Sequence, residues 1–170
     1  MRIMWGSFVI LYLFSNPRTV TELADICKTP KHLGRWMWHN LRYIKDIKLY
    51  KTPEYWANPE ETLSHRAGDC EDFAVLAQAV LREKGVEALI VGAYSGGVKK
   101  KGHASCVFYN NKKHRWYLIG TKGLRRGPKE FRDIPKHLID DPKIYRVYNE
   151  NKEIQQEYVL VRGIWRRIDM

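Results

Sequence analysis

Apolar and polar residues follow two different periods along the chain, one in each half. Apolar residues recur every three or four positions over Leu33–Lys45 and again over Cys70–Lys84, which predicts two amphipathic helices. A shorter helix is expected over Thr19–Cys27, and Pro30 marks the break that follows it. Residues 51–63 contain two prolines and are expected to be irregular. The first half of the chain is therefore predicted to be mainly helical.

After Glu87 the period shortens to that of β-strands. The stretches predicted as strands are Leu89–Tyr94, His103–Tyr109, Arg115–Ile119, Ile144–Tyr148 and Glu157–Val161. Asn110–Lys113 is expected to form a hairpin turn, and residues 128–142 a mixed connection with a helical turn near Phe131. Helices followed by an antiparallel sheet predict an α+β fold, with residues 1–170 forming one domain.

The apolar stretch Ile3–Phe14 is too short to cross a bilayer as a helix, so no transmembrane span is expected. The residues after it, Ser15–Pro17, do not offer the small residues of a signal-peptidase site. A buried first element is therefore favoured over a secretion signal, which stays open as the alternative.

The three cysteines, Cys27, Cys70 and Cys106, include no closely spaced pair. This spacing fits neither a disulfide framework nor a standard zinc site, and no metal or other cofactor is expected. Unpaired cysteines favour a reducing compartment, and hence a cytoplasmic location, without requiring it.

The sequence carries a formal net charge of +11 and a pI near 9.6. Such a charge suits an acidic partner: a nucleic acid, an anionic membrane surface or another negatively charged polymer. A solvated basic surface explains the same charge equally well.

The candidate chemistry centres on Cys70. Asp69 is a good helix N-cap, and Asp72 follows three residues later in a capping-box arrangement. Cys70 is therefore expected at the first helical position, where the partial positive charge of the helix terminus favours a thiolate. The carboxylates of Asp69, Glu71 and Asp72 oppose this effect.

A candidate base for this thiol is His103, at the start of a predicted strand. A histidine in that position can take the thiol proton and activate a cysteine nucleophile. Because side chains alternate along a strand, His103 and Ser105 share one face, while Ala104 and Cys106 share the other. This argues against a joint site for a metal on Cys106 and His103. The alternative is that Cys70 is a core thiol.

Four segments resemble a known family: Tyr55–Leu63, Gly68–Ala74, Gly102–Ala104 and Trp116–Ile119. They look like the transglutaminase-like superfamily, and most like its bacterial cysteine-peptidase-like branch. The resemblance covers about residues 33–124. It implies a papain-like fold in which a central helix carries the cysteine and packs on an antiparallel sheet that carries His and Asp. It also implies thiol attack by Cys70 on an amide of a protein or peptide, with His103 as base and a thioester that water or an amine resolves.

The sequence departs from the family at the third catalytic position. The family's Asp, four residues past an aromatic such as Trp116, corresponds here to Gly120. Loss of an orienting carboxylate can cost on the order of 10⁴ in rate. Three readings stay open: a slow Cys–His dyad; a substitute acceptor, for which the candidates are Thr121, Asn110 and Asp133; or a decayed site in a structural, assembly or binding protein.

Two basic loops are expected near this site, because the start of one hairpin strand lies beside the end of the next. Their residues are Lys99, Lys100, Lys101, Lys122, Arg125 and Arg126. A cationic rim would favour an acidic substrate. The alternative is that these residues are two solvated surface loops without a binding role.

DNA binding is a less favoured reading. Thr19–Ile44 loosely resembles a helix-turn-helix, but Trp36, Met37 and Trp38 suit packing better than contacts to bases. The oligomeric state is left open.

Overall fold

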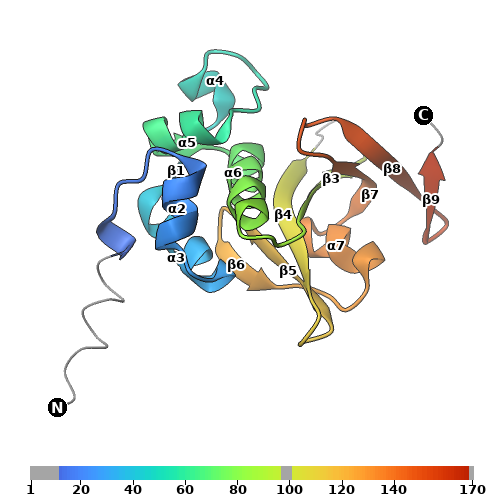
Figure 1. Cartoon of the computed structure of the whole chain (residues 1–170). Coiled ribbons are helices and arrows are strands. Elements are labelled where there is room, and N and C mark those ends of the chain that lie inside the picture. The colour runs from blue at the N-terminus through green and yellow to red at the C-terminus, as the bar shows by residue number, and fades with distance from the viewer. Residues whose placement is uncertain (1–11, 97–100, 169–170) are drawn as a thin grey trace.

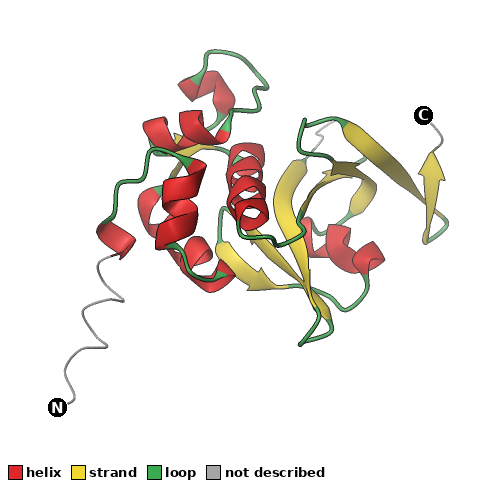
Figure 2. Ribbon diagram, viewed as in Figure 1, coloured by secondary structure: helices red, strands yellow, loops and turns green. Residues whose placement is uncertain are grey.

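A single seven-stranded sheet forms the framework of the molecule. The computed structural model describes residues 12–96 and 101–168. Every neighbouring pair of strands in the sheet is antiparallel, in the order β6-β5-β4-β3-β7-β8-β9, and helices lie on both faces (Figures 1 and 2). The strands are β3 (Leu89–Ser95), β4 (Gly102–Asn110), β5 (Arg115–Gly120), β6 (Gly123–Arg126), β7 (Pro142–Tyr148), β8 (Ile154–Val161) and β9 (Ile164–Ile168). The predicted α+β class is confirmed.

Most helices precede the sheet in the chain, as the sequence predicts. They are the 3-10 helix η1 (Tyr12–Phe14) and the helices α2 (Val20–Ile26), α3 (Pro30–Asn40), α4 (Asp46–Leu49), α5 (Pro59–His65) and α6 (Cys70–Glu83). A two-stranded parallel ladder, β1 (Arg42–Tyr43) with β2 (Ala67–Gly68), ties this region together. Later in the chain, η2 (Phe131–Asp133) and α7 (Ile134–Leu138) form the predicted mixed connection.

Two stretches of the first half differ from the prediction. Helix α3 ends at Asn40 rather than at Lys45, because Leu41 takes an extended conformation and β1 follows at once. Residues 59–65 form α5 although two prolines precede or begin it. Pro59 stands in the first helical turn, where its missing N–H costs nothing, and Asn58 and Glu61 form a capping box.

The sheet separates two apolar clusters. On one face α6 buries Phe73, Leu76 and Val80 against residues of β3 and β4 that include Ile90 and Cys106. The other face is covered by α7. There Ile134 belongs to a cluster with Val91, Ala93, Val107 and Leu118. Successive residues of β4 thus serve opposite faces, as the alternation predicts.

Helix α3 lies unusually close to β6. A Cβ atom on Gly34 would lie 2.5 Å from the backbone nitrogen of Leu124. Gly123 has a φ of +66°, and a Cβ there would lie 2.8 Å from the carbonyl oxygen of Gly34. Glycine at both positions therefore lets the two backbones touch.

Only the end of the apolar N-terminal stretch is described. Tyr12 is buried and stacks on His32 of α3, and residues 3–11 lie outside the described part of the chain. Within residues 12–96 and 101–168, no helix is long and apolar enough to cross a membrane.

We predict that Gly34→Ala destabilises the protein by roughly 1–3 kcal/mol, because the added methyl group forces α3 away from β6. Chemical denaturation monitored by far-UV circular dichroism measures the change. The exposed neighbour Arg35 is the matched control, since Arg35→Ala is expected to shift stability by no more than about 0.5 kcal/mol. Equal stability of the two variants would contradict the close approach.

Candidate active site

Cys70 is the first residue of α6, and a buried carboxylate fixes that helix start. The predicted capping box between Asp69 and Asp72 is present: the Asp69 N–H donates to Asp72 Oδ2 at 3.1 Å. The second oxygen, Asp72 Oδ1, accepts from the Ala57 N–H at 2.8 Å. A Cβ on Gly68 would lie 2.6 Å from Asp72 Oδ2, so this approach requires glycine. The position of Cys70 therefore depends on a segment well upstream of α6.

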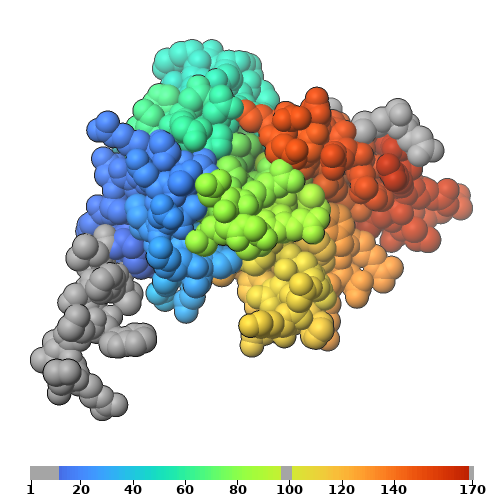
Figure 3. Space-filling model, in the orientation of Figure 1, coloured from blue at the N-terminus to red at the C-terminus, as the bar shows by residue number. Residues whose placement is uncertain are grey.

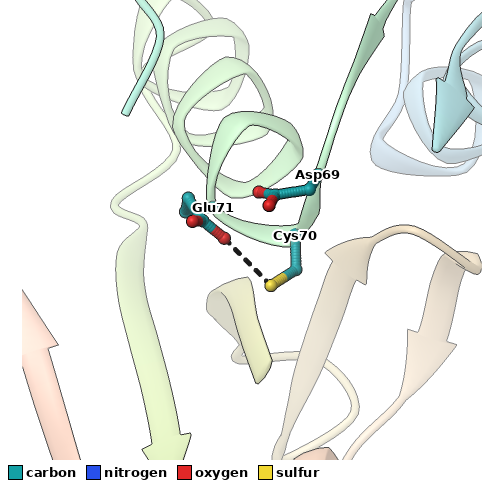
Figure 4. Close-up of side chains that lie close together, drawn as sticks. All are labelled: Asp69, Cys70 and Glu71. Atoms are coloured by element: carbon teal, nitrogen blue, oxygen red, sulfur yellow. Dashed lines mark hydrogen bonds between the residues drawn. The ribbon is translucent and has the colours of Figure 1, made fainter. Parts of the chain in front are cut away.

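The surroundings of the Cys70 thiol disfavour the thiolate. Its sulfur donates to Glu71 Oε2 at 3.0 Å, and the Asp69 carboxylate points toward Glu71 nearby (Figure 4). Burial raises the pKa of the thiol well above its usual range, and the negative charges of Glu71 and Asp69 raise it further. The backbone N–H of Ala104 acts in the opposite direction. Burial and the acidic neighbours together therefore keep the thiol protonated.

His103 reaches the site from the far face of the sheet. It pairs with Ala93, a member of the cluster under α7, while Ala104 and Cys106 pack on the α6 side. Cys70 and His103 nevertheless line one cavity of about 660 Å³. Burial lowers the pKa of His103, and the positive charges of Arg125 and Lys122 lower it further. An imidazolium is therefore disfavoured as well.

Gly120 lies at the same end of the sheet as His103 and on the same face. A Cβ on Gly120 would be 3.2 Å from Ser105 Oγ, and Ser105 donates to the Ile119 carbonyl at 2.9 Å. Of the suggested substitutes for the missing Asp, Asn110 is wrong, because it ends β4 at the opposite end from His103 and accepts from the Lys113 N–H.

The other two candidates for the missing Asp are Asp133 and Thr121, and no contact connects either of them with His103 among the described residues. Asp133 lies in η2, where its carbonyl oxygen contacts the ring of His137. Thr121 directly follows β5. The identity of a third catalytic residue stays a prediction.

The cavity has a charge pattern that differs from the predicted cationic rim. Beside the sulfur its lining is acidic, with Asp46, Glu54, Asp69 and Glu71. Positive charge comes from Lys45, Arg146 and Lys152 elsewhere in the lining, and from Lys122 and Arg125 near His103. Lys101 is exposed, and Lys99 and Lys100 lie outside the described residues.

An aromatic wall, which the sequence analysis missed, faces the acidic side. The hydroxyls of Tyr94 and Tyr148 are 2.7 Å apart, and the Arg146 guanidinium stacks 5.2 Å from the centre of the Tyr94 ring. The ring also fills the space beside Gly102, where a Cβ would lie 2.9 Å from it. The signal in the sequence was Gly102 opposite Tyr94 on the neighbouring strand, since a glycine leaves room for a ring.

The β7–β8 turn completes this wall. Lys152 donates to the Trp56 carbonyl at 2.7 Å and to Asn58 Oδ1 at 3.0 Å, and the Trp56 ring packs against Tyr148. In Figure 3 the turn and the segment before α5 meet at the top of the molecule. Residues from both halves of the chain therefore line the cavity.

The carboxylates next to the thiol could hold a divalent cation. Oxygens of Asp46, Asp69 and Asp72 lie within 4.8 Å of one another, as do the ligand atoms of Asp69, Cys70 and Glu71. Asp46 is only 1% exposed, and its Oδ1 and that of Asp69 have no hydrogen-bond partner among the described residues. Oxygen ligands of this kind suit calcium or magnesium. The sequence analysis missed the cluster, because Asp46 lies far upstream and joins it only through folding.

A sequence model of the transglutaminase-like superfamily matches residues 16–120, more than half of the chain. The chain belongs to the transglutaminase-like superfamily. Its resemblance to this family, read from the motifs around Cys70 and His103, is thereby confirmed. A comparison with curated proteins gives no match.

This superfamily member is also similar in fold to solved structures. LapG from Legionella pneumophila, after EGTA treatment, is similar with a TM-score of 0.51 and 17% identity over 95% of this chain and 77% of LapG. A second LapG structure has a TM-score of 0.49 and 19% identity, and the match covers 85% of this chain and 72% of LapG. A putative cysteine protease from Cytophaga hutchinsonii has a TM-score of 0.45 and 17% identity. The match covers 99% of this chain and 58% of the protease chain. The papain-like α+β fold is confirmed.

We predict that the unfolding temperature falls as the pH rises from about 4 to about 8 in the presence of a chelator. Burial raises the pKa of Asp69 to about 8 and that of Asp72 to about 6, so the folded state binds protons more tightly than the unfolded chain. The associated stability is present at low pH and is lost as these carboxyls ionise. Asp69→Asn should flatten the decline, whereas Asp140→Asn, on the surface, should leave it unchanged.

We also predict that millimolar calcium raises the unfolding temperature of chelator-treated protein. The rise should be larger at pH 8 than at pH 6, because protons compete for the same oxygens. Differential scanning fluorimetry measures it. Asp46→Asn and Asp69→Asn should each abolish the calcium effect and Asp140→Asn should not. The same rise in all three variants would argue against binding at this cluster.

Proposed function

We propose that this protein is a thiol enzyme of low activity that acts on amide bonds of a protein or peptide. Cys70 is the nucleophile and His103 the base, and the outcome is hydrolysis, as in a cysteine peptidase or amidase, or acyl transfer. The observation that carries this proposal is the place of the Cys70 sulfur. It stands at a capped helix start, in a cavity shared with His103 and facing the Ala104 N–H.

The reaction follows from these positions. His103 takes the thiol proton while the sulfur attacks the amide carbon, and the carbonyl oxygen becomes an oxyanion. The tetrahedral intermediate expels the amine, which leaves with the proton from His103. Water or a second amine then attacks the thioester and releases Cys70. Transfer and hydrolysis differ only in this last nucleophile.

Low activity follows from the electrostatics. The thiolate–imidazolium pair needs a thiol that ionises easily and an imidazole that holds a proton. Here burial raises the pKa of Cys70 and the charges of Glu71 and Asp69 raise it further. Burial lowers the pKa of His103, and the charges of Arg125 and Lys122 lower it further. Gly120 offers no carboxylate to stabilise the imidazolium. A cation bound among the carboxylates would ease the first of these effects.

The comparisons support the class of reaction and leave the substrate open. One similar structure is described as a putative cysteine protease, and the likeness is one of fold. We propose residues 1–170 as one domain that takes a protein or peptide substrate of acidic character, because Lys122 and Arg125 stand near the base. DNA binding is less favoured, since Trp36 and Met37 of α3 are buried in the core.

The second candidate function is that of a decayed fold used in assembly or binding. Gly120 in place of the acid and cations beside His103 favour it, because both remove what a base needs. This reading predicts no turnover and an ordinary, unreactive Cys70.

We predict that Gly120→Asp raises kcat/KM for peptide amide hydrolysis by roughly 10²–10⁴, since it restores an orienting carboxylate on the face of His103. Gly120→Asn is the matched control: it has the same size without the charge and should gain far less. Cys70→Ala should abolish turnover in either background. The gain is measured with a fluorogenic peptide library.

Labelling with iodoacetamide separates the two candidates when no substrate is known. Cys27 and Cys106 are fully buried, so free cysteine in solution is the reference rather than either of them. An enzyme predicts faster labelling of Cys70 in Gly120→Asp than in Gly120→Asn. If Cys70 labels alike in both, and neither variant turns over any peptide, the decayed fold is the correct reading.

A further inference from the structure

A second cavity lies where α3 approaches β6, apart from the one that holds Cys70. Its volume is about 360 Å³. Helix α3 contributes Lys31, Gly34, Arg35 and Trp38, which share one helical face because they are three or four residues apart. Lys122, Gly123 and Leu124 form the opposite side. We refer to these seven residues as the α3–β6 groove.

The α3–β6 groove combines an exposed indole with three cations. Trp38 is 60% exposed, whereas its neighbours Trp36 and Met37 are fully buried. The expectation that all three residues pack in the core is therefore wrong for Trp38. Lys31, Arg35 and Lys122 are exposed around it. Tryptophan and arginine are the residues that most often dominate binding interfaces.

The backbones of α3 and β6 are in contact at the floor of the groove. Gly34 and Gly123 carry no side chains there, and the Trp38 indole is exposed beside them. Trp38 Cβ lies 3.7 Å from the position of a Cβ on Gly123. An apolar side chain of a ligand can therefore rest on the indole while its charged neighbours meet the cations.

Lys122 links the groove to the catalytic centre. It lines the groove, and it is also one of the two cations whose charge acts on His103. The other, Arg125, follows on β6 and donates to the His137 carbonyl. Positive charge thus continues from the groove to the base, on the side away from the acidic lining around Cys70.

We propose that the α3–β6 groove is an exosite for an acidic segment of the polypeptide substrate. An aromatic or other apolar side chain of that segment packs on Trp38, and its carboxylates pair with Lys31, Arg35 and Lys122. A peptide is favoured over a nucleic acid because the groove is small and continues toward a site for amide chemistry. The exosite role rests on the proposed function, but binding to the groove does not.

Binding is tested on the Cys70→Ala protein, so that no turnover intervenes. The probe is a fluorescein-labelled decapeptide of alternating Glu and Tyr, followed by fluorescence anisotropy. Trp38→Ala and the double variant Lys31→Glu/Arg35→Glu are each expected to weaken binding at least tenfold. Lys112→Glu/Lys113→Glu makes the same charge change in the exposed β4–β5 turn and is expected to weaken it less than threefold. Unfolding temperatures verify that each variant is folded.

Two results would overturn the proposal. Equal weakening by the Lys112/Lys113 and Lys31/Arg35 pairs would mean that net charge alone attracts the peptide. Tighter binding of a fifteen-nucleotide oligothymidine, with the same dependence on Trp38, would mean that the groove takes single-stranded nucleic acid. Groove binding by the decapeptide without turnover of any peptide by the Gly120→Asp protein would support the groove and refute the thiol enzyme. Thus the two proposals fail separately.

Discussion

The buried carboxylate of Asp72 is the constraint on which the site depends. It accepts the Ala57 N–H and the Asp69 N–H, and both oxygens are used. One side chain therefore joins the start of α6, the turn before it and the segment before α5. Apolar packing holds α6 on β4, and Asp72 fixes the turn at which Cys70 begins the helix. The helix start that Asp72 fixes also holds Glu71 and Asp69 beside the Cys70 sulfur, where burial and their charges raise the pKa of the thiol.

Cys70 and His103 occupy opposite sides of a strand with opposite charges around them. Acidic groups gather beside the Cys70 sulfur, whereas the charges of Arg125 and Lys122 act on His103. In an active thiol enzyme the cysteine needs positive and the histidine negative surroundings, so each group here has the surroundings that suit the other. An external cation near Cys70 and an anion near His103 would correct both at once, which makes the site responsive to what binds around it.

The sequence predicts those parts of the fold that depend on interactions between residues close together in the chain. The capping box of α6, the strand alternation that separates His103 from Cys106, and the motif-based family all follow from residues a few positions apart. The helix α5 was missed because a proline at a helix start looks the same as a proline in a loop. Asp46 and Trp38 could not be placed, since burial of one and exposure of the other depend on which segments pack there. The absence of Asp at position 120 and the cations Lys122 and Arg125 near His103 could be predicted from the sequence, whereas Asp46 and Glu54 in the acidic lining depend on how distant segments pack.

The cavity is lined by residues from two parts of the sheet. The family match ends at residue 120, where β5 ends, while Arg146, Tyr148 and Lys152 come from β7 and the turn after it. These strands add to the free side of β3 rather than to the side of β5. Part of the cavity wall is thus built by strands that follow the region matched by the family. Because Tyr145, Val147 and Tyr148 are buried in the two apolar clusters beneath the site, a change in β7 that alters the cavity wall also acts on the framework that holds Cys70 and His103. The cavity wall and the catalytic core are therefore coupled in this chain.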